Sequence, residues 1–188
     1  MRQLLYIVGP PGVGKTTALA SALAGVLVAE CSQPFSRQLY LALDGSVRGA
    51  QLGAARRGFA GTDALPADVQ PRVERWLADC ELPFVVGEGD RLANTRFFRE
   101  VRRLGWALSV VHLAAWWSVC HSRRLARAAE LGERLPSDEW LWRRHARSAL
   151  LAQEFTSPEW CLNGVCSPEV VAARLREHPV IRGLRGGA

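Results

Sequence analysis

A run near the start of the sequence has the residue types that bind phosphate, Gly9-Pro10-Pro11-Gly12-Val13-Gly14-Lys15-Thr16. It matches the pattern GxxxxGK[ST], whose glycines let backbone N–H groups curl around a phosphate at the start of a helix. The lysine of such a loop reaches the β- and γ-phosphates, and the next hydroxyl binds Mg²⁺. Lys15 is the only lysine among the 24 basic residues of the chain. The run, extended by Thr17, therefore predicts a binding loop for ATP with Mg²⁺.

Asp44 directly follows an apolar run at residues 39–43 that predicts the second strand. The carboxyl ends of parallel strands border the crevice where α/β proteins bind ligands, so Asp44 is expected to point into that crevice. A carboxylate there can accept the proton of an acceptor hydroxyl during phosphoryl transfer, which makes Asp44 a candidate catalytic residue. The alternative is a plain turn, because Asp44-Gly45 is a strong turn dipeptide.

A second acidic segment follows the apolar strand at residues 84–86, with the sequence Gly87-Glu88-Gly89-Asp90. An acid after a buried strand can bind Mg²⁺ directly or through water, together with the Thr16 hydroxyl. The segment departs from the common form of four aliphatic residues and an aspartate, so the choice between Glu88 and Asp90 as metal ligand stays open. A solvated loop is the alternative, since acids and glycines are normal loop residues.

Arginines gather on both sides of a short turn, at Arg123, Arg124 and Arg127 before it and at Arg143, Arg144 and Arg147 after it. Two arginine-bearing helices at about residues 123–147 are expected to close over the triphosphate as a lid. The expected catalytic arginines are Arg123, Arg127 and Arg144. Solvated helix faces are the alternative, because surface arginine is common.

Apolar runs typical of strands alternate with helical patterns along the chain. Strands are expected at residues 4–8, 39–43, 84–86, 106–113 and 160–162, and helices at residues 15–29, 67–80, 94–104, 117–130, 137–154 and from 167. Strands separated by helices predict right-handed βαβ units and a parallel sheet with helices on both faces. The expected fold class is therefore α/β, with three layers in the order α/β/α.

The composition of the 188 residues indicates one domain, at residues 1–181, with a flexible tail at residues 182–188. No apolar run reaches the roughly 18 residues of a membrane span, and no signal-peptide pattern is present, so a cytoplasmic protein without a membrane partner is expected. The five cysteines include no CxxC pair, which argues against a zinc ribbon. The net charge of +6 is concentrated in residues 91–188 and favours polyanionic partners, although an arginine-rich coding bias is the alternative.

The chain resembles the adenylate-kinase-like group of P-loop kinases over about residues 3–180. The resemblance lies in the order of four features: the phosphate loop, the acid after the second strand, the acidic segment after the third strand and the arginine lid. The resemblance implies a P-loop NTPase fold with a five-stranded parallel sheet, similar to nucleoside monophosphate kinases, with a short lid. It also implies ATP and Mg²⁺ as cofactors, and no protein partner.

Four shorter runs resemble a bacteriophage family of P-loop kinases: Asp44-Gly45-Ser46, Gly61-Thr62-Asp63-Ala64-Leu65, Val69-Gln70-Pro71 and Gly87-Glu88-Gly89-Asp90-Arg91-Leu92-Ala93-Asn94. Some relatives of that group phosphorylate the hydroxymethyl group of 5-hydroxymethyluracil in DNA. The resemblance thus implies a DNA-modifying kinase, localised in the cytoplasm of a host cell. His145-Ala146-Arg147 departs from the lid pattern of the group. Residues expected to bind the acceptor are Asp44, Arg48, Thr62, Asp63, Arg91, Trp116 and Trp117.

Two adjacent tryptophans, Trp116 and Trp117, follow the fourth expected strand near the ligand crevice. Adjacent residues cannot both face inward, and an exposed indole beside arginines suits stacking on a nucleobase. Core packing is the alternative, because aromatic residues are mostly buried. Three functions stay open at this point: a kinase for a modified base in DNA, a kinase for a nucleoside, nucleotide or other small metabolite, and an ATPase without an acceptor.

Overall fold

The computed structural model of the protein describes residues 1–54, 61–132 and 134–186. The arginine- and glycine-rich loop at residues 55–60 and Glu133 in the expected lid lie outside the described residues. The elements in chain order are β1 (Gln3–Val8), α1 (Lys15–Ala22), β2 (Leu27–Cys31), β3 (Arg37–Leu41), β4 (Val47–Leu52), η1 (Gly61–Ala64), α2 (Gln70–Asp79), β5 (Phe84–Glu88), α3 (Thr95–Arg103), β6 (Ala107–Ala114), α4 (Trp117–Leu131), α5 (Asp138–Phe155), η2 (Pro158–Trp160), β7 (Cys161–Asn163), α6 (Pro168–Arg176) and α7 (Pro179–Arg185).

The described strands form one seven-stranded sheet in the order β2-β3-β4-β5-β1-β6-β7. Strands β4, β5, β1, β6 and β7 pair in parallel, as the βαβ pattern predicts. The expectation of five strands is wrong, because β2 and β3 join the sheet beside β4 in antiparallel pairs. The parallel strands bring their carboxyl ends to one edge of the sheet, where the loop after β1 carries the phosphate-binding sequence.

The helix expected at residues 15–29 is also shorter than predicted. Helix α1 ends at Ala22, and the chain turns through Gly25, which has a φ of 82°, into strand β2. Apolar residues continue through this turn, so hydrophobic periodicity does not mark the end of the helix. The pairing of β2 with β3, with Val28 opposite Tyr40, decides the strand, and only the folded chain brings the two together.

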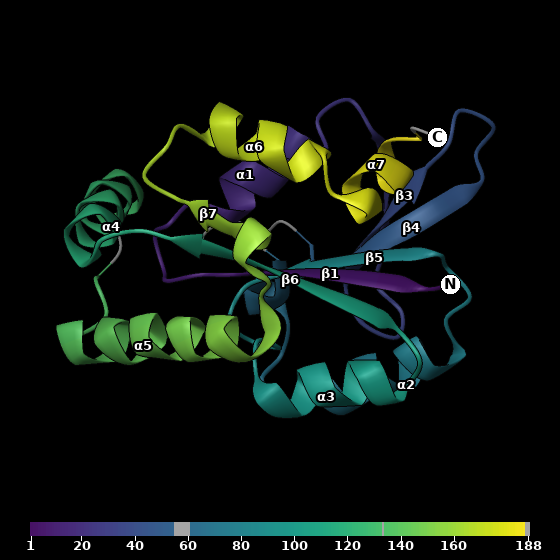
Figure 1. The fold of residues 1–188 in the computed structure, drawn as a ribbon, viewed down its shortest axis with the longest axis horizontal. Helices are drawn as coiled ribbons and strands as arrows, with labels where there is room; N and C mark the ends of the chain where they lie inside the picture. The colour runs from purple at the N-terminus through teal and green to yellow at the C-terminus, as the bar shows by residue number, and fades with distance from the viewer. Residues whose placement is uncertain (55–60, 133, 187–188) are drawn as a thin grey trace.

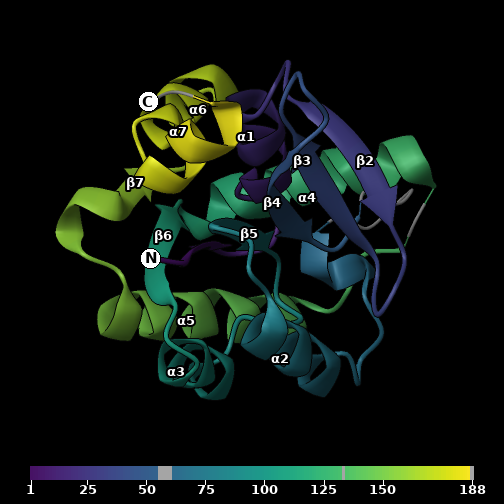
Figure 2. The same cartoon turned by 90° about the vertical axis from the view of Figure 1, so that its right-hand side faces the viewer.

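Helices cover both faces of the sheet, which confirms the expected layers (Figures 1 and 2). One face carries α1, α6 and α7, and the opposite face carries α2, α3 and α5. Two buried clusters fill the layers, one around Tyr6, Phe97 and Phe98 under α2, α3 and α5, the other around Leu5 and Ile7 under α1, α6 and α7. Among the described helices, none is long and apolar enough to cross a membrane.

The expected flexible tail is ordered over most of its length. Helix α7 runs from Pro179 to Arg185, and Ile181 and Leu184 are fully buried against the sheet. Residues 187–188 lie outside the described part of the chain. The glycines at residues 183 and 186 suggested fraying, but two buried aliphatic side chains hold the helix in place.

Phe98 offers a test of the layer under α3. It is fully buried, and its ring lies 5.1 Å from both Tyr6 and Phe155, centroid to centroid. Phe98→Ala is expected to lower the free energy of unfolding by about 3–5 kcal/mol, because it leaves a cavity in a packed aromatic cluster. Urea unfolding measures the change. Leu43→Ala is the control: its side chain is 95% exposed, so a change within about 0.5 kcal/mol is expected. Equal losses in the two variants would contradict this packing.

Candidate active site

The phosphate loop is shaped by close contacts that require glycine. Gly14 has a φ of 101° and immediately precedes α1, so the loop enters the helix in a left-handed conformation that other residues rarely adopt. At Gly12, with a φ of 87°, a Cβ atom would lie 2.6 Å from the Cys120 carbonyl oxygen and 2.8 Å from the Arg124 side chain. The loop is thus held between β1 and α4, with its N–H groups at the start of α1, and this geometry fits a phosphate.

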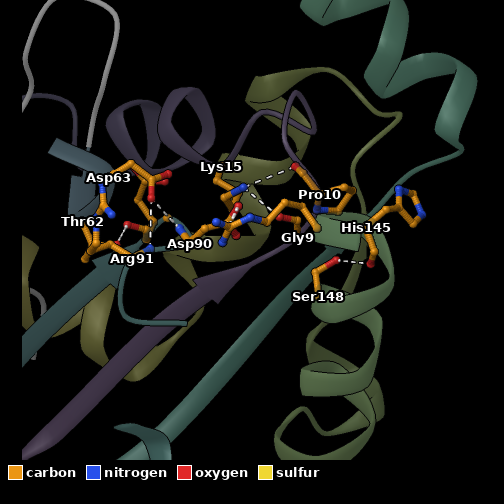
Figure 3. A network of polar contacts seen from close by, with 12 residues as sticks. Gly9, Pro10, Lys15, Thr62, Asp63, Asp90, Arg91, His145 and Ser148 are labelled. Carbon is orange, nitrogen blue, oxygen red and sulfur yellow. Dashed lines mark hydrogen bonds and ion pairs between the residues drawn. The ribbon is translucent and has the colours of Figure 1, made fainter. Parts of the chain in front are cut away.

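Lys15 lies within this loop. Its ammonium donates hydrogen bonds to the carbonyl oxygens of Gly9 at 2.8 Å and of Pro10 at 3.3 Å (Figure 3). The residue is only 9% exposed, so its charge acts in a medium that screens it weakly. The ammonium also lowers the pKa values of the Glu88 and Asp63 carboxyls, partly offsetting the effect of their burial.

Glu88 is the acid that contacts the phosphate loop. The Thr16 hydroxyl donates a hydrogen bond to Glu88 Oε1 at 2.9 Å, and Glu88 is 2% exposed at the end of β5. Burial raises the pKa of this carboxyl, while Lys15 and the Thr16 hydrogen bond lower it. Thr16 and Glu88 together offer the oxygen ligands that Mg²⁺ prefers, with nucleotide phosphates and water as the remaining ligands. Among the described residues, no cluster of three acidic, His or Cys side chains could hold a metal without such help.

Asp63 and Asp90 form a second acidic pair beside Glu88. Asp63 Oδ1 accepts hydrogen bonds from the backbone N–H groups of Asp90 at 2.9 Å and Arg91 at 3.0 Å (Figure 3). Burial and the nearby Asp90 raise the pKa of Asp63, and Lys15 lowers it. Asp90 lies 3.8 Å from the Arg144 guanidinium. The geometry therefore divides the two acids after β5, with Glu88 beside the phosphate loop and Asp90 beside the arginine helix.

A buried hydroxyl network fixes the loop that carries Asp63. Thr62 Oγ1 donates to the Glu88 carbonyl oxygen at 2.9 Å, and the Tyr6 hydroxyl donates to the Gly89 carbonyl oxygen at 2.9 Å. The two hydroxyls also lie 2.9 Å apart. Tyr6 is fully buried, and burial raises the pKa of its phenol well above the usual value. Sequence reasoning missed Tyr6, which looks like an ordinary strand residue.

The arginines of the expected lid divide into different environments. Arg144, on α5, reaches Asp90 and lies over the ring of Trp140 at 5.0 Å. Arg123, on α4, instead donates to the carbonyl oxygens of Val13 at 3.1 Å and Gly164 at 2.7 Å. That contact ties α4 to the phosphate loop and to the segment after β7, a tethering arrangement that the sequence pattern does not reveal.

The third of the expected catalytic arginines is Arg127, which is exposed one turn beyond Arg123 on α4. Arg124, not among the expected catalytic residues, lines a narrow pocket over the prolines of the phosphate loop. The spacing of arginines in the sequence therefore indicates the α4–α5 region, but it does not show which of these arginines lie at the site.

Aromatic residues join α4 and α5 above the loop. Trp117 stacks on Trp142 with ring centroids 5.2 Å apart, and His121 stacks on Trp117 at 5.7 Å. His145 contacts both indoles edge-on and faces the pocket over Pro10 and Pro11. Burial lowers the pKa of His145, so its ring is neutral near pH 7. Trp116 is 77% exposed, as expected of one member of an adjacent pair. The departure of His145-Ala146-Arg147 from the lid pattern was the available signal for this histidine.

The structure corrects the expectation for Asp44 and Arg48. Strand β3 runs antiparallel to β4, so the turn between them lies at the amino ends of β4 and β5, away from the phosphate loop. Asp44 is exposed there and accepts hydrogen bonds from the Ser46 N–H and hydroxyl. Arg48 lies beside Gly186, at the end of α7. The turn interpretation of Asp44-Gly45 is confirmed, and the acid that follows the second parallel strand is Asp63.

Strand β1, the glycine loop, helix α1 and a buried acid on the adjacent strand define a P-loop nucleotide-binding protein with a kinase-like site. A family model described as P-loop Nucleotide Kinase3 matches residues 1–175, and the chain belongs to this family. No curated protein showed a match to the chain. The family supports a phosphotransferase that uses a nucleotide, usually with Mg²⁺.

Glu88→Gln tests two effects of the Glu88 charge: its contribution to activity and its effect on the free energy of unfolding. Burial raises the pKa of the Glu88 carboxyl in the folded protein. A carboxyl with a raised pKa stabilises the folded state at pH values below about 4–5, the ordinary carboxyl pKa range. This contribution is lost as the pH rises through the pKa of the folded state. The amide keeps an acceptor for Thr16 but carries no charge. Urea unfolding between pH 4 and 8 is therefore expected to show the variant gaining stability over wild type as pH rises, while Mg²⁺-dependent activity falls.

Glu81→Gln is the matched control, because Glu81 is exposed at the start of the same segment. Its unfolding curve is expected to follow that of wild type over the same pH range. A Glu88→Gln variant that is less stable than wild type near pH 7 would show that the buried charge stabilises the fold.

Proposed function

We propose that the protein is an ATP-dependent kinase that transfers the γ-phosphoryl group to a hydroxyl, and that the preferred acceptor is the hydroxymethyl group of 5-hydroxymethyluracil in phage DNA. The observation that carries the proposal is Asp63, a half-buried carboxylate after β4 held by the N–H groups of Asp90 and Arg91. A raised pKa brings a carboxylate closer to the value that suits a general base near neutral pH.

On the donor side, the loop at residues 9–17 holds the phosphates, and Lys15 contributes a poorly screened positive charge to the β- and γ-phosphates. Bound ATP supplies the phosphoryl group, and Mg²⁺ neutralises the charge that develops during transfer. Thr16 and Glu88 hold the metal side of the site. Arg144, which lies 3.8 Å from Asp90 at the edge of the site, is proposed to add positive charge beside the transferred group.

On the acceptor side, Asp63 takes up the proton that the acceptor hydroxyl loses. Arg91 is exposed and donates its backbone N–H to Asp63, and its side chain is proposed to contact the acceptor. Thr62 precedes Asp63 but is buried and bonded to Glu88 and Tyr6, so we propose that it positions the loop instead. The exposed indole of Trp116 is proposed to stack on a base next to the modified one, since stacking tolerates any sequence. The net charge of +6 supports a polyanionic acceptor such as DNA.

Labelled ATP distinguishes the acceptor classes. Incubation with DNA that contains 5-hydroxymethyluracil is expected to label the DNA, and Lys15→Ala is expected to abolish the labelling. Thymine DNA of the same sequence is the acceptor control. Label on free nucleosides or monophosphates but not on DNA would replace the proposed acceptor with a small molecule. Hydrolysis without any labelled acceptor would replace the kinase with an ATPase.

Asp63→Asn tests the proposed base. The amide retains an oxygen for the Asp90 and Arg91 N–H groups but cannot accept the proton, so kcat is expected to fall by roughly 10²–10⁴-fold with little change in KM for ATP. In wild type, kcat is expected to rise with pH through the raised pKa of Asp63, because the base must be ionised. The pH–rate profile of Asp63→Asn is expected to lose this acidic limb. Asp44→Asn, with its carboxylate at the opposite end of the sheet, is expected to keep both the rate and the limb.

A further inference from the structure

A groove between α3 and α5 lies outside the residues assigned above. Its volume is about 720 Å³, within the range of ligand sites, and it is lined by residues 94–96 at the start of α3 and by Arg147, Leu150, Gln153 and Glu154 on α5. We name it the α3–α5 groove. It is open to solvent along the surface between the two helices.

The groove opens beside the proposed reaction centre. Arg144 and Arg147 are three residues apart on α5 and therefore point to the same side of that helix. Arg144 lies 3.8 Å from Asp90, and Asn94, four residues after Asp90, forms the near wall of the groove. A ligand in the groove would thus continue directly from an acceptor placed at Asp63 and Asp90.

The two arginines at the groove are exposed and differ in how far their charge is compensated. Arg96 is 79% exposed and forms a long ion pair with Glu74, at 4.0 Å. Arg147 is exposed, with no ion-pair partner in the described ranges 1–54, 61–132 and 134–186. The groove carboxylate, Glu154, is already paired with Arg99 at 2.9 Å. Arg147 is therefore available to an anion, and a phosphate would compete with Glu74 for Arg96.

An apolar floor accompanies this charge. Leu150 is 65% exposed in the groove and offers aliphatic surface to a sugar or base. From Arg147 to Glu154 the groove follows α5 for about 10 Å, which is about three base-pair rises along the axis of B-form DNA. Arginines at the rim with an apolar floor match a phosphodiester backbone whose sugars face inward.

We propose that the α3–α5 groove binds the phosphodiester backbone of the DNA strand next to the nucleotide that is phosphorylated, with Arg96 and Arg147 contacting consecutive phosphates. This proposal rests on the proposed DNA acceptor, since a small-molecule kinase has no use for a track leading away from its site. The groove gives the enzyme affinity for DNA that does not depend on base sequence.

The test measures DNA binding without ATP. Fluorescence anisotropy follows a labelled single-stranded oligonucleotide that contains 5-hydroxymethyluracil, at several salt concentrations. The double variant Arg96→Ala/Arg147→Ala is expected to weaken binding at least 10-fold and to reduce the slope of log K against log [salt] by about 1 to 2, because two phosphate contacts are lost. A duplex of the same sequence reports whether the groove also accepts paired DNA.

Arg103→Ala is the matched control. It removes one charge from the same helix, at a residue 71% exposed that is ion-paired with Glu100 and lies outside the groove. Wild-type binding is expected for this variant. Equal losses in Arg103→Ala and in each single groove variant would overturn the groove, because a general loss of positive charge would then explain both. Circular dichroism and ATP binding check that all variants are folded.

Kinase assays on the same variants separate the two proposals. With DNA as acceptor, KM is expected to rise in the double variant and in Arg96→Ala alone, while transfer by Arg96→Ala to the free nucleoside 5-hydroxymethyl-2′-deoxyuridine is expected to stay unchanged. If the double variant binds and phosphorylates DNA as well as wild type does, the groove proposal is wrong and the kinase proposal is unaffected. Groove-dependent DNA binding by a wild-type protein that transfers no phosphoryl group would overturn the DNA kinase and leave the groove standing.

Discussion

The buried carboxylate of Glu88 and its contact with the phosphate loop are the constraint on which the rest of the site depends. A carboxylate that is 2% exposed loses most of its hydration, and the cost is partly offset by the Thr16 hydrogen bond and by the Lys15 ammonium. The same three groups fix the end of β5 against the start of α1. Removing the Thr16 hydroxyl or the Lys15 ammonium would raise the cost of the Glu88 charge further, so the loop and the end of β5 depend on each other.

The hydroxyl network behind Glu88 extends this constraint to the acceptor side. Tyr6 and Thr62 fix the backbone at residues 88–89, and the backbone after it donates to Asp63. Since Tyr6 and Thr62 are buried and every group in this series is hydrogen-bonded, a shift of one would leave another unsatisfied. The proposed base is thereby held at a fixed place relative to the phosphate loop, which is what in-line transfer requires.

Helix α5 connects three parts of the molecule along one side. Arg144 reaches the acidic pair, His145 faces the prolines of the phosphate loop, and Ser148 donates to the His145 carbonyl oxygen at 2.8 Å within the helix (Figure 3). The stack of Trp117 on Trp142 joins α5 to α4 and so to the loop that α4 contacts at Gly12. Any shift of α5 would therefore change contacts at the phosphate loop, at Asp90 and in the α3–α5 groove.

The amino-acid sequence by itself determined the donor side of this protein. The spacing of Gly9, Gly14, Lys15 and Thr16 between a strand and a helix is a local pattern, and backbone geometry alone converts it into a phosphate loop. The alternation of apolar runs and helices likewise predicted a parallel α/β sheet with two covered faces.

Tertiary structure decided what local patterns do not encode. The antiparallel pairing of β3 with β4 sets the direction of the strand before Asp44 and places that acid at the far end of the sheet, so that Asp63 follows the second parallel strand instead. Tertiary structure also brings Glu88 into contact with Thr16 and Asp90 close to Arg144, because distances between residues on different elements depend on strand register and helix packing.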